Sequence, residues 1–198
     1  MTGLVAAACA AVFMAPAPAG AVQTPEAHRA KEGPHCVADA VTQKTTCYDT
    51  FRESIAAATG GRITDAPATP QKAATDKEFL AKLNAPAKTA ANTPASRTTA
   101  TSSQTIGAVL YEHGNYSGQS LTLTMYVPCG VGSRFAYSDL GSEFYRFDNL
   151  TSSLIASGNC QVELFENISL TGASQKYTSS VGWVGNAMND HASSVLLT

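Results

Sequence analysis

Two six-residue segments of this 198-residue chain place acidic, amide and hydroxyl side chains in the same order. The first runs from Asp148 to Ser153 (Asp-Asn-Leu-Thr-Ser-Ser), and the second runs from Asn189 to Ser194 (Asn-Asp-His-Ala-Ser-Ser). Each segment offers carboxylate, amide, hydroxyl and backbone carbonyl oxygens, which are the ligands that a hard cation such as Ca²⁺ prefers. Each is followed by a short apolar stretch, so the two copies indicate a duplicated structural unit.

A second repeated element lies upstream of each loop. Tyr111 to Gly118 reads aromatic, four residues, aromatic, any residue, glycine. Phe165 to Gly172 repeats it 54 residues later, with Leu170 in place of the second aromatic. The serine pairs are only 41 residues apart, so the first unit carries about 13 extra residues, among them Cys129.

These two motifs, in this order and both doubled, resemble those of the βγ-crystallin superfamily over residues 106–198, particularly its secreted microbial calcium-binding members. The resemblance implies two four-stranded Greek keys packed as a sandwich, with the aromatic-to-glycine elements as folded hairpins. It also implies calcium sites that each draw oxygens from both keys. The implied ligands are the side chains of Asp148, Asn149, Ser152, Asn189, Asp190 and Ser193, and the backbone carbonyl groups of Leu150, His191, Glu112 and Glu166.

The spacing of apolar residues supports an all-β fold independently. Leu121, Leu123 and Met125 alternate with threonines, and Val162 and Leu164 flank Glu163. This period of two is the pattern of half-buried strands. Short strands separated by Gly, Asn and Ser favour an antiparallel sandwich over parallel βαβ units.

The start of the chain predicts secretion. Residues 4–14 are apolar and the small residues 19–21 form a cleavage site, so we assign 1–21 as a signal peptide. The apolar run is too short to span a bilayer, which needs about 20 residues. The first basic residue is Arg29, so the basic start of a usual signal peptide is missing, and we expect translation to begin upstream.

Four cysteines remain after the signal peptide, and an even number in a secreted chain indicates disulfides. Three pairings are possible. We favour Cys36 with Cys47 and Cys129 with Cys160, because each pair then stays inside one compositional region.

Residues 33–66 read as a small cysteine-clipped unit, made of a hairpin and a helix. Thr50 and Glu53 form a capping box at the helix start, and Phe51, Ile55 and Ala58 share one helical face. The unit has too few apolar residues to bury a core alone, so it needs its disulfide or docks on the sandwich.

Residues 67–105 are rich in Ala, Thr, Pro, Ser and Lys, which predicts a flexible linker that lets the sandwich move independently. A short helix over 76–84 is predicted inside it, because Thr75 and Glu78 make another capping box ahead of Phe79. Without a partner surface this helix would be transient.

Several function classes lack their signatures. The net charge is −2 and no basic stripe or basic amphipathic helix is visible, so we expect neither nucleic acid nor membrane binding. No nucleophile elbow, zinc-protease helix or phosphate loop occurs, so we expect no enzyme. His113 is expected to face solvent, and Trp183 to pack in the core of the second key.

The sequence therefore predicts a secreted, monomeric, non-catalytic calcium-binding protein. With one aspartate in each loop, weak affinity near 10⁻⁴ to 10⁻³ M is expected, on the order of extracellular sites. The same loops could be turns without metal, because Asx and Ser side chains also bond neighbouring backbone amides. Two other functions fit the fold: an inhibitor of an extracellular (metallo)protease that uses the 127–132 loop, and a killer-toxin-like antifungal protein.

Overall fold

The computed structural model describes residues 33–39, 42, 44–85, 104–130, 132–142 and 145–198. These belong to one compact unit spanning 31–198. The predicted signal peptide, 1–21, and residues 86–103 of the predicted linker lie outside the described residues. Within the described part of the chain, no helix is long and apolar enough to cross a membrane.

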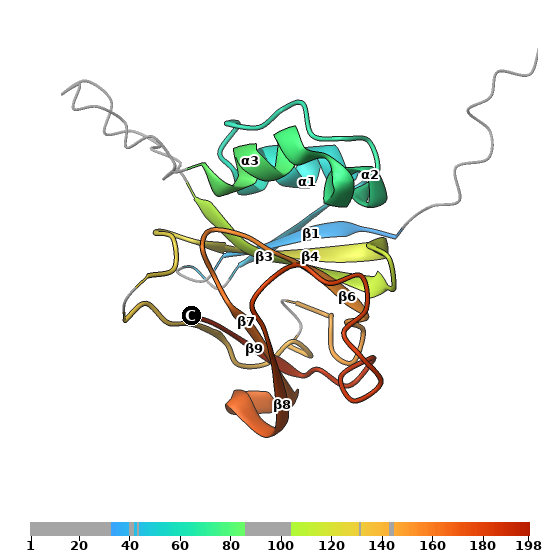
Figure 1. Ribbon diagram of the computed structural model, residues 1–198, viewed down its shortest axis with the longest axis vertical. Coiled ribbons are helices and arrows are strands. Elements are labelled where there is room, and N and C mark those ends of the chain that lie inside the picture. Colours follow the sequence, from blue (N-terminus) through green and yellow to red (C-terminus); the bar gives the residue numbers. More distant parts are fainter. Residues whose placement is uncertain (1–32, 40–41, 43, 86–103, 131, 143–144) are drawn as a thin grey trace, which may run out of the picture. The chain divides into compact units, whose positions relative to one another are not determined.

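Nine strands and three α-helices make up the described fold, and Figure 1 shows their arrangement. The N-terminal elements are β1 (His35–Asp39), β2 (Thr45–Tyr48), α1 (Phe51–Ala58), α2 (Pro70–Thr75) and α3 (Lys77–Asn84). The first Greek key contains β3 (Thr105–His113), β4 (Ser117–Met125), β5 (Phe135–Tyr137) and β6 (Ser153–Ala156). The second contains β7 (Val162–Asn167), β8 (Thr171–Tyr177) and β9 (Ser194–Leu197).

The strands form two sheets that exchange elements between the keys. The first sheet has the order β2-β1-β4-β3-β6, and the second has the order β5-β9-β7-β8. β5 of the first key pairs with β9 in the second sheet. Reciprocally, Val181 of the second key bridges Leu154 of β6 in the first sheet. This two-Greek-key sandwich is the fold that the sequence predicts.

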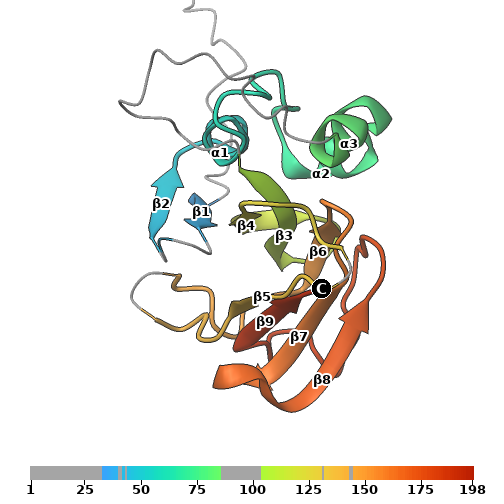
Figure 2. The same cartoon turned by 90° about the vertical axis from the view of Figure 1, so that its left-hand side faces the viewer.

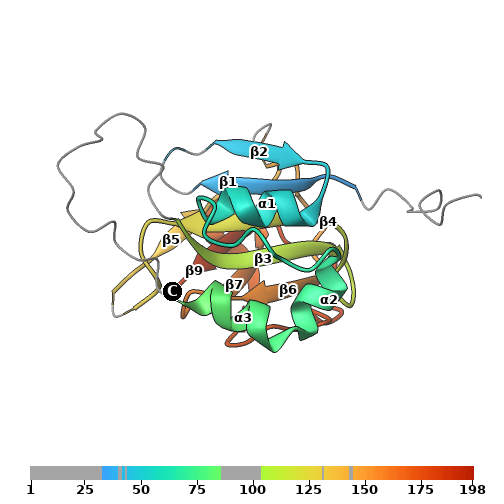
Figure 3. The same cartoon turned by 90° about the horizontal axis from the view of Figure 1, so that it is seen from above.

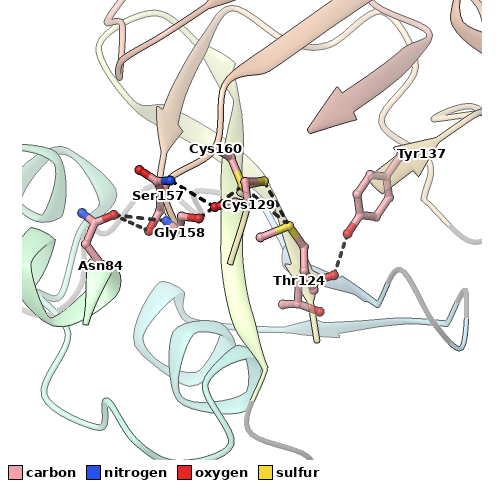
Figure 4. The surroundings of a disulfide bond; sticks show 9 residues. Asn84, Thr124, Cys129, Tyr137, Ser157, Gly158 and Cys160 are labelled. Atoms are coloured by element: carbon pink, nitrogen blue, oxygen red, sulfur yellow. Dashed lines mark hydrogen bonds between the residues drawn. A yellow bond between two sulfur atoms is a disulfide. The ribbon is translucent and has the colours of Figure 1, made fainter. Parts of the chain in front are cut away.

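An apolar core fills the space between the two sheets. Its members include Leu110, Leu121, Leu154, Val162, Leu164, Val195 and Leu197, all fully buried. The disulfide between Cys129 and Cys160 belongs to this core. Figure 4 shows its surroundings, where Tyr137 Oη donates to Thr124 O at 2.7 Å.

The N-terminal unit is not a separate body. β1 pairs in parallel with β4, from His35 opposite Ser120 to Asp39 opposite Thr124. β2 pairs antiparallel with β1, and the Cys36–Cys47 disulfide joins the two strands. This segment, which has too few apolar residues for a core of its own, therefore extends the first sheet by two strands.

The three helices cover the outer face of the first sheet (Figure 1 and Figure 3). A second apolar cluster lies between them, with Phe51, Ile55, Ala73, Phe79 and Leu83 packed against Ile106, Val109, Tyr111 and Ile155 of the strands. We call residues 33–85, which carry β1, β2 and these helices, the N-terminal layer. The first key is thus buried on both sides.

The N-terminal layer corrects the linker prediction. Residues 70–84 are not part of a linker but form α2 and α3, because Ala73, Phe79 and Leu83 find an apolar sheet face to cover. The predicted cap of α3 was also misplaced: Asp76, not Thr75, accepts from the backbone N–H groups of Glu78 and Phe79. The α1 cap at Thr50 forms as predicted, with Glu53 N donating to Thr50 Oγ1 at 3.2 Å.

Asn84 ties the end of α3 to the sandwich. Its Oδ1 accepts from Gly158 N at 3.1 Å and from Ser157 Oγ at 3.4 Å, close to the Cys129–Cys160 disulfide (Figure 4). Thr122 and Thr124 of β4, expected on a solvent face, are fully buried beneath the N-terminal layer. The alternating pattern of β4 therefore separates two buried faces.

Candidate metal centre

The two hairpins have the same backbone. Tyr116 and Leu170 occupy equivalent positions, with φ of 60° and 59°, and Gly118 and Gly172 follow with φ of 77° and 79°. Positive φ suits glycine because it has no Cβ. The leucine that replaces the family's aromatic thus leaves the hairpin geometry unchanged.

The second serine of each loop supports its own hairpin. In the first key, Ser153 Oγ donates to His113 O at 2.7 Å and accepts from Tyr116 N at 3.0 Å. In the second key, Ser194 Oγ makes the same two contacts, to Asn167 O at 2.5 Å and from Leu170 N at 3.0 Å. Only the first serine of each pair remains for a ligand.

The two loops contact each other through reciprocal backbone bonds. Asn149 N donates to Ala192 O at 3.0 Å, and Asp190 N donates to Thr151 O at 3.2 Å. Asn149 and Asp190 are equivalent residues, and both adopt the left-handed conformation, with φ of 54° and 57°. Each loop therefore donates one backbone hydrogen bond to the loop of the other key.

One group of oxygens, which we call the first cluster, gathers residues from both keys. Ser152 Oγ donates to Glu112 O at 2.7 Å and lies 3.3 Å from Asp190 Oδ1. Beside Asp190, Asn189 Nδ2 donates to Asp190 Oδ2 at 2.7 Å. Asn189 Oδ1 is buried and has no hydrogen-bond partner among the described residues. A buried acceptor without a donor is costly, and a cation would satisfy it.

The equivalent second cluster is less closely joined. It consists of Glu166, Ser193, Asp148 and Asn149, of which Asn149 Nδ2 donates to Asp148 Oδ2 at 3.1 Å. Over the described ranges, Ser193 Oγ makes no hydrogen bond to Glu166 O or to a loop side chain. The structure thus brings the first set of predicted residues into contact and leaves the second set adjacent through backbone bonds alone.

The glutamates serve the hairpins with their side chains. Glu112 Oε2 accepts from Gln119 N at 3.3 Å, and Glu166 Oε2 accepts from Ala173 N at the same distance. Their backbone carbonyl groups are therefore the parts available to the clusters. The ligand role of these two carbonyl groups, and of those of Leu150 and His191, stays a prediction.

The donor set is poor in charge. In the part of the chain that the structure describes, no group of three or more His, Cys, Asp or Glu side chains could hold a metal ion. The clusters instead combine carbonyl, hydroxyl, amide and single carboxylate oxygens. Such hard, mostly neutral oxygens fit Ca²⁺ better than Zn²⁺, which prefers nitrogen and sulfur.

Two residues near the clusters were misread or missed. Trp183 was expected in the core but is half exposed, with its ring 3.4 Å from where a Cβ on Gly114 would lie. Asp139, which the sequence analysis did not single out, lies near Asp148. A Cβ on Gly141 would be 3.3 Å from Asp139 Oδ1 and 3.2 Å from Asp148 Cβ. No repeat or motif marks Asp139, so only the folded structure reveals it.

A solved structure of a double mutant of a βγ-crystallin domain from Clostridium beijerinckii is 33% identical to this chain. The match covers 47% of this chain and 97% of the clostridial domain, with a TM-score of 0.38. Over that part, the chain is similar to a βγ-crystallin domain. Another βγ-crystallin domain structure from the same organism is 28% identical, over 46% of this chain and 95% of that domain, with a TM-score of 0.36.

A third βγ-crystallin structure is a clostrillin double mutant in complex with nickel. It is 30% identical, and the match covers 47% of this chain and 98% of that protein, with a TM-score of 0.38. No model of a known protein family matches the chain, and no curated protein does. The βγ-crystallin matches cover about half of the chain. The described residues, which include the N-terminal layer as well as the sandwich, make up more of the chain than that.

Proposed function

We propose that the protein is a secreted, non-catalytic calcium-binding βγ-crystallin in which the cation joins the two Greek keys. The contact of Ser152 Oγ with Glu112 O and Asp190 Oδ1 carries this proposal, because it assembles three oxygens from both keys at one point. The unpartnered, buried Asn189 Oδ1 supports it.

Glu112, Ser152, Asn189 and Asp190 would hold one Ca²⁺, and Glu166, Ser193, Asp148 and Asn149 a second. When bound, calcium supplies positive charge that offsets the loop aspartates. The protein's own part is to hold the loops side by side through the reciprocal bonds of Asn149 and Asp190. Two disulfides favour an oxidising, extracellular location.

The two sites should differ in affinity. Each cluster contains one carboxylate, Asp190 in the first and Asp148 in the second, so charge does not separate them. In the first cluster, however, Ser152 Oγ already contacts Glu112 O and Asp190 Oδ1. Preorganised ligands lower the ordering cost of binding. We therefore expect the first cluster to bind more tightly, with Kd on the order of 10⁻⁴ M, and the second near 10⁻³ M.

Calorimetric titration of the full chain with Ca²⁺ tests the proposal. Wild-type protein should release or absorb heat in two phases, and Asp190→Asn should weaken the tighter phase. Asp49→Asn removes an equal charge from an exposed residue of the N-terminal layer and should leave both phases unchanged. At 100 times Kd, calcium should also raise the free energy of unfolding by about 2.7 kcal/mol. If calcium produces no heat of binding and no stabilisation, the proposal is refuted.

A further inference from the structure

The two sheets differ at equivalent edges. β4 and β8 are the second strands of their keys, and β4 is covered along its outer edge by β1. β8 ends the order of the second sheet (Figure 2). No described strand pairs with its outer edge, and all residues from Thr171 to Lys176 are exposed. Such an edge is a template for another strand.

The covered edge shows which backbone groups of β8 point outward. On β4, Ser120 N donates to Pro34 O beside β1 at 3.3 Å, so Ser120 faces outward. Ser120 pairs with Tyr111 as Ser174 pairs with Phe165, so Ser174 is its equivalent. Because outward groups alternate along a strand, Gly172, Ser174 and Lys176 present their N–H and C=O groups away from β7.

The charges around β8 fit a second copy of the same strand. In an antiparallel pair centred on Ser174, Lys176 of one copy lies opposite Gly172 of the other. Lys176 is the strand's one charged residue, so no like charges meet. Glu166 lies at this end of β8, with its carboxylate on Ala173 N and its Cβ 3.3 Å from where a Gly172 Cβ would be. The two-fold arrangement therefore places each lysine, which also lies 3.6 Å from Glu163 Oε2 of its own copy, near the other copy's Glu166.

From this register and charge pattern we propose that β8 is a self-association edge, through which two copies form one continuous eight-stranded sheet. The interface is a single strand pair, so the dimer is weak, with Kd on the order of 10⁻⁴ M. This differs from the monomer expected from the sequence, because an uncovered edge becomes visible only when β1 is seen to cover the other. The contact is independent of calcium.

Sedimentation velocity of the full chain in chelator, from about 1 μM to 1 mM, tests the proposal by bracketing the expected Kd. Wild-type protein should shift from monomer to dimer, and Ser174→Pro should stay monomeric because it loses an outward donor without touching the β7 ladder. Ser174→Thr, which keeps the donor, should still dimerise. Lys176→Glu should weaken the dimer about tenfold, and Lys176→Glu with Glu166→Lys should restore it.

Two results would overturn the proposal. One is a wild-type monomer throughout the concentration range. The other is a dimer that Ser174→Pro leaves intact, which would place self-association on a different surface. Circular dichroism of Ser174→Pro establishes that the variant is folded, and if it is not, the Lys176 and Glu166 exchange decides the outcome alone.

Discussion

The outer faces of the two Greek keys have opposite characters. In the first key, Val109 lies between Thr122 and Ile155 on neighbouring strands, and all three are buried under the N-terminal layer. In the second key, the equivalent of Val109 is Glu163, which lies between Lys176 and Leu196. Glu163 pairs with Lys176 at 3.6 Å and faces solvent in part.

This difference shows how one fold accommodates an added domain segment. Both keys keep the same hairpins, the same contacts of the second serine and the same left-handed loop residue. Away from the clusters, the faces and edges of the two keys differ. The position of Val109, under the covering layer of the first key, is taken in the second key by the charged Glu163.

Removing the N-terminal layer is expected to have the largest effect. A chain that begins at residue 104 would expose Ile106, Val109, Tyr111 and Ile155, each fully or almost fully buried. At about 1.5 to 3 kcal/mol per side chain, the loss approaches the whole stability of a typical domain. We expect the shortened chain to aggregate, which size-exclusion chromatography detects, or to lose its fixed tertiary packing, which near-UV circular dichroism detects. A soluble, cooperatively melting fragment would contradict the two-sided burial of the first key.

Exchanging the equivalent residues tests the comparison at one position. Val109→Glu buries a charge in an apolar cluster and should cost roughly 3 to 5 kcal/mol. The reciprocal Glu163→Val loses only a partly exposed ion pair, worth less than about 1 kcal/mol. Urea unfolding of both variants measures the difference. Equal costs would mean that the two faces do not differ as described.

The two disulfides should contribute unequally. Cys129–Cys160 closes a loop with a sequence separation of 31, and Cys36–Cys47 one of 11. The loop-entropy estimate gives about 4 kcal/mol for the first and about 3 kcal/mol for the second. Paired Cys→Ser variants, compared by thermal unfolding, check the order. A larger loss from the Cys36–Cys47 pair would show that the N-terminal layer depends on its disulfide more than the sandwich depends on Cys129–Cys160.

Acid should destabilise the covered key through His35. Its ring is buried, lies 2.9 Å from Ser120 Oγ through Nδ1 and packs edge-on against Phe51. Burial lowers the His35 pKa from 6.5, so the unfolded chain binds the proton more tightly. The stability that the neutral ring provides is thus present above pH 6.5 and lost as the pH falls below it.

Between pH 7 and pH 5 this loss amounts to at most about 2 kcal/mol. Urea unfolding across this range should show the decline in wild-type protein and a flatter profile in His35→Asn. His113, an exposed residue of the first hairpin, provides the control, since His113→Asn should keep the wild-type profile. A wild-type slope in His35→Asn would exclude His35 as the cause.

The sequence predicted what local pattern encodes. Repeated motifs located both hairpins and both loops, and the alternation around Glu163 gave a strand with one exposed face, as the structure has it. The same alternation in β4 misled, because the partner that covers Thr122 lies far away in the sequence. The capping pattern located α3, but composition hid α2 and the sheet face that both helices cover, which is what makes their few large apolar residues sufficient.

Within the candidate site, the motif gave the residue types, but their contacts depend on the packing of one key against the other. The closeness of Ser152 to Asp190 arises from reciprocal bonds between loops 41 residues apart, which no local pattern specifies. Trp183 was misplaced for a similar reason, since hydrophobicity predicts burial while the first hairpin holds it at the surface.

An anomalous difference map from crystals grown in calcium is the most direct test of the central claim. Our account predicts a peak in contact with Glu112 O, Ser152 Oγ and the Asp190 carboxylate, and a weaker peak beside Ser193 and Asn149. The first peak should disappear from crystals of Asp190→Asn grown at a calcium concentration near the wild-type Kd. A well-ordered map with no peak at either loop, or with peaks only elsewhere, would contradict the account.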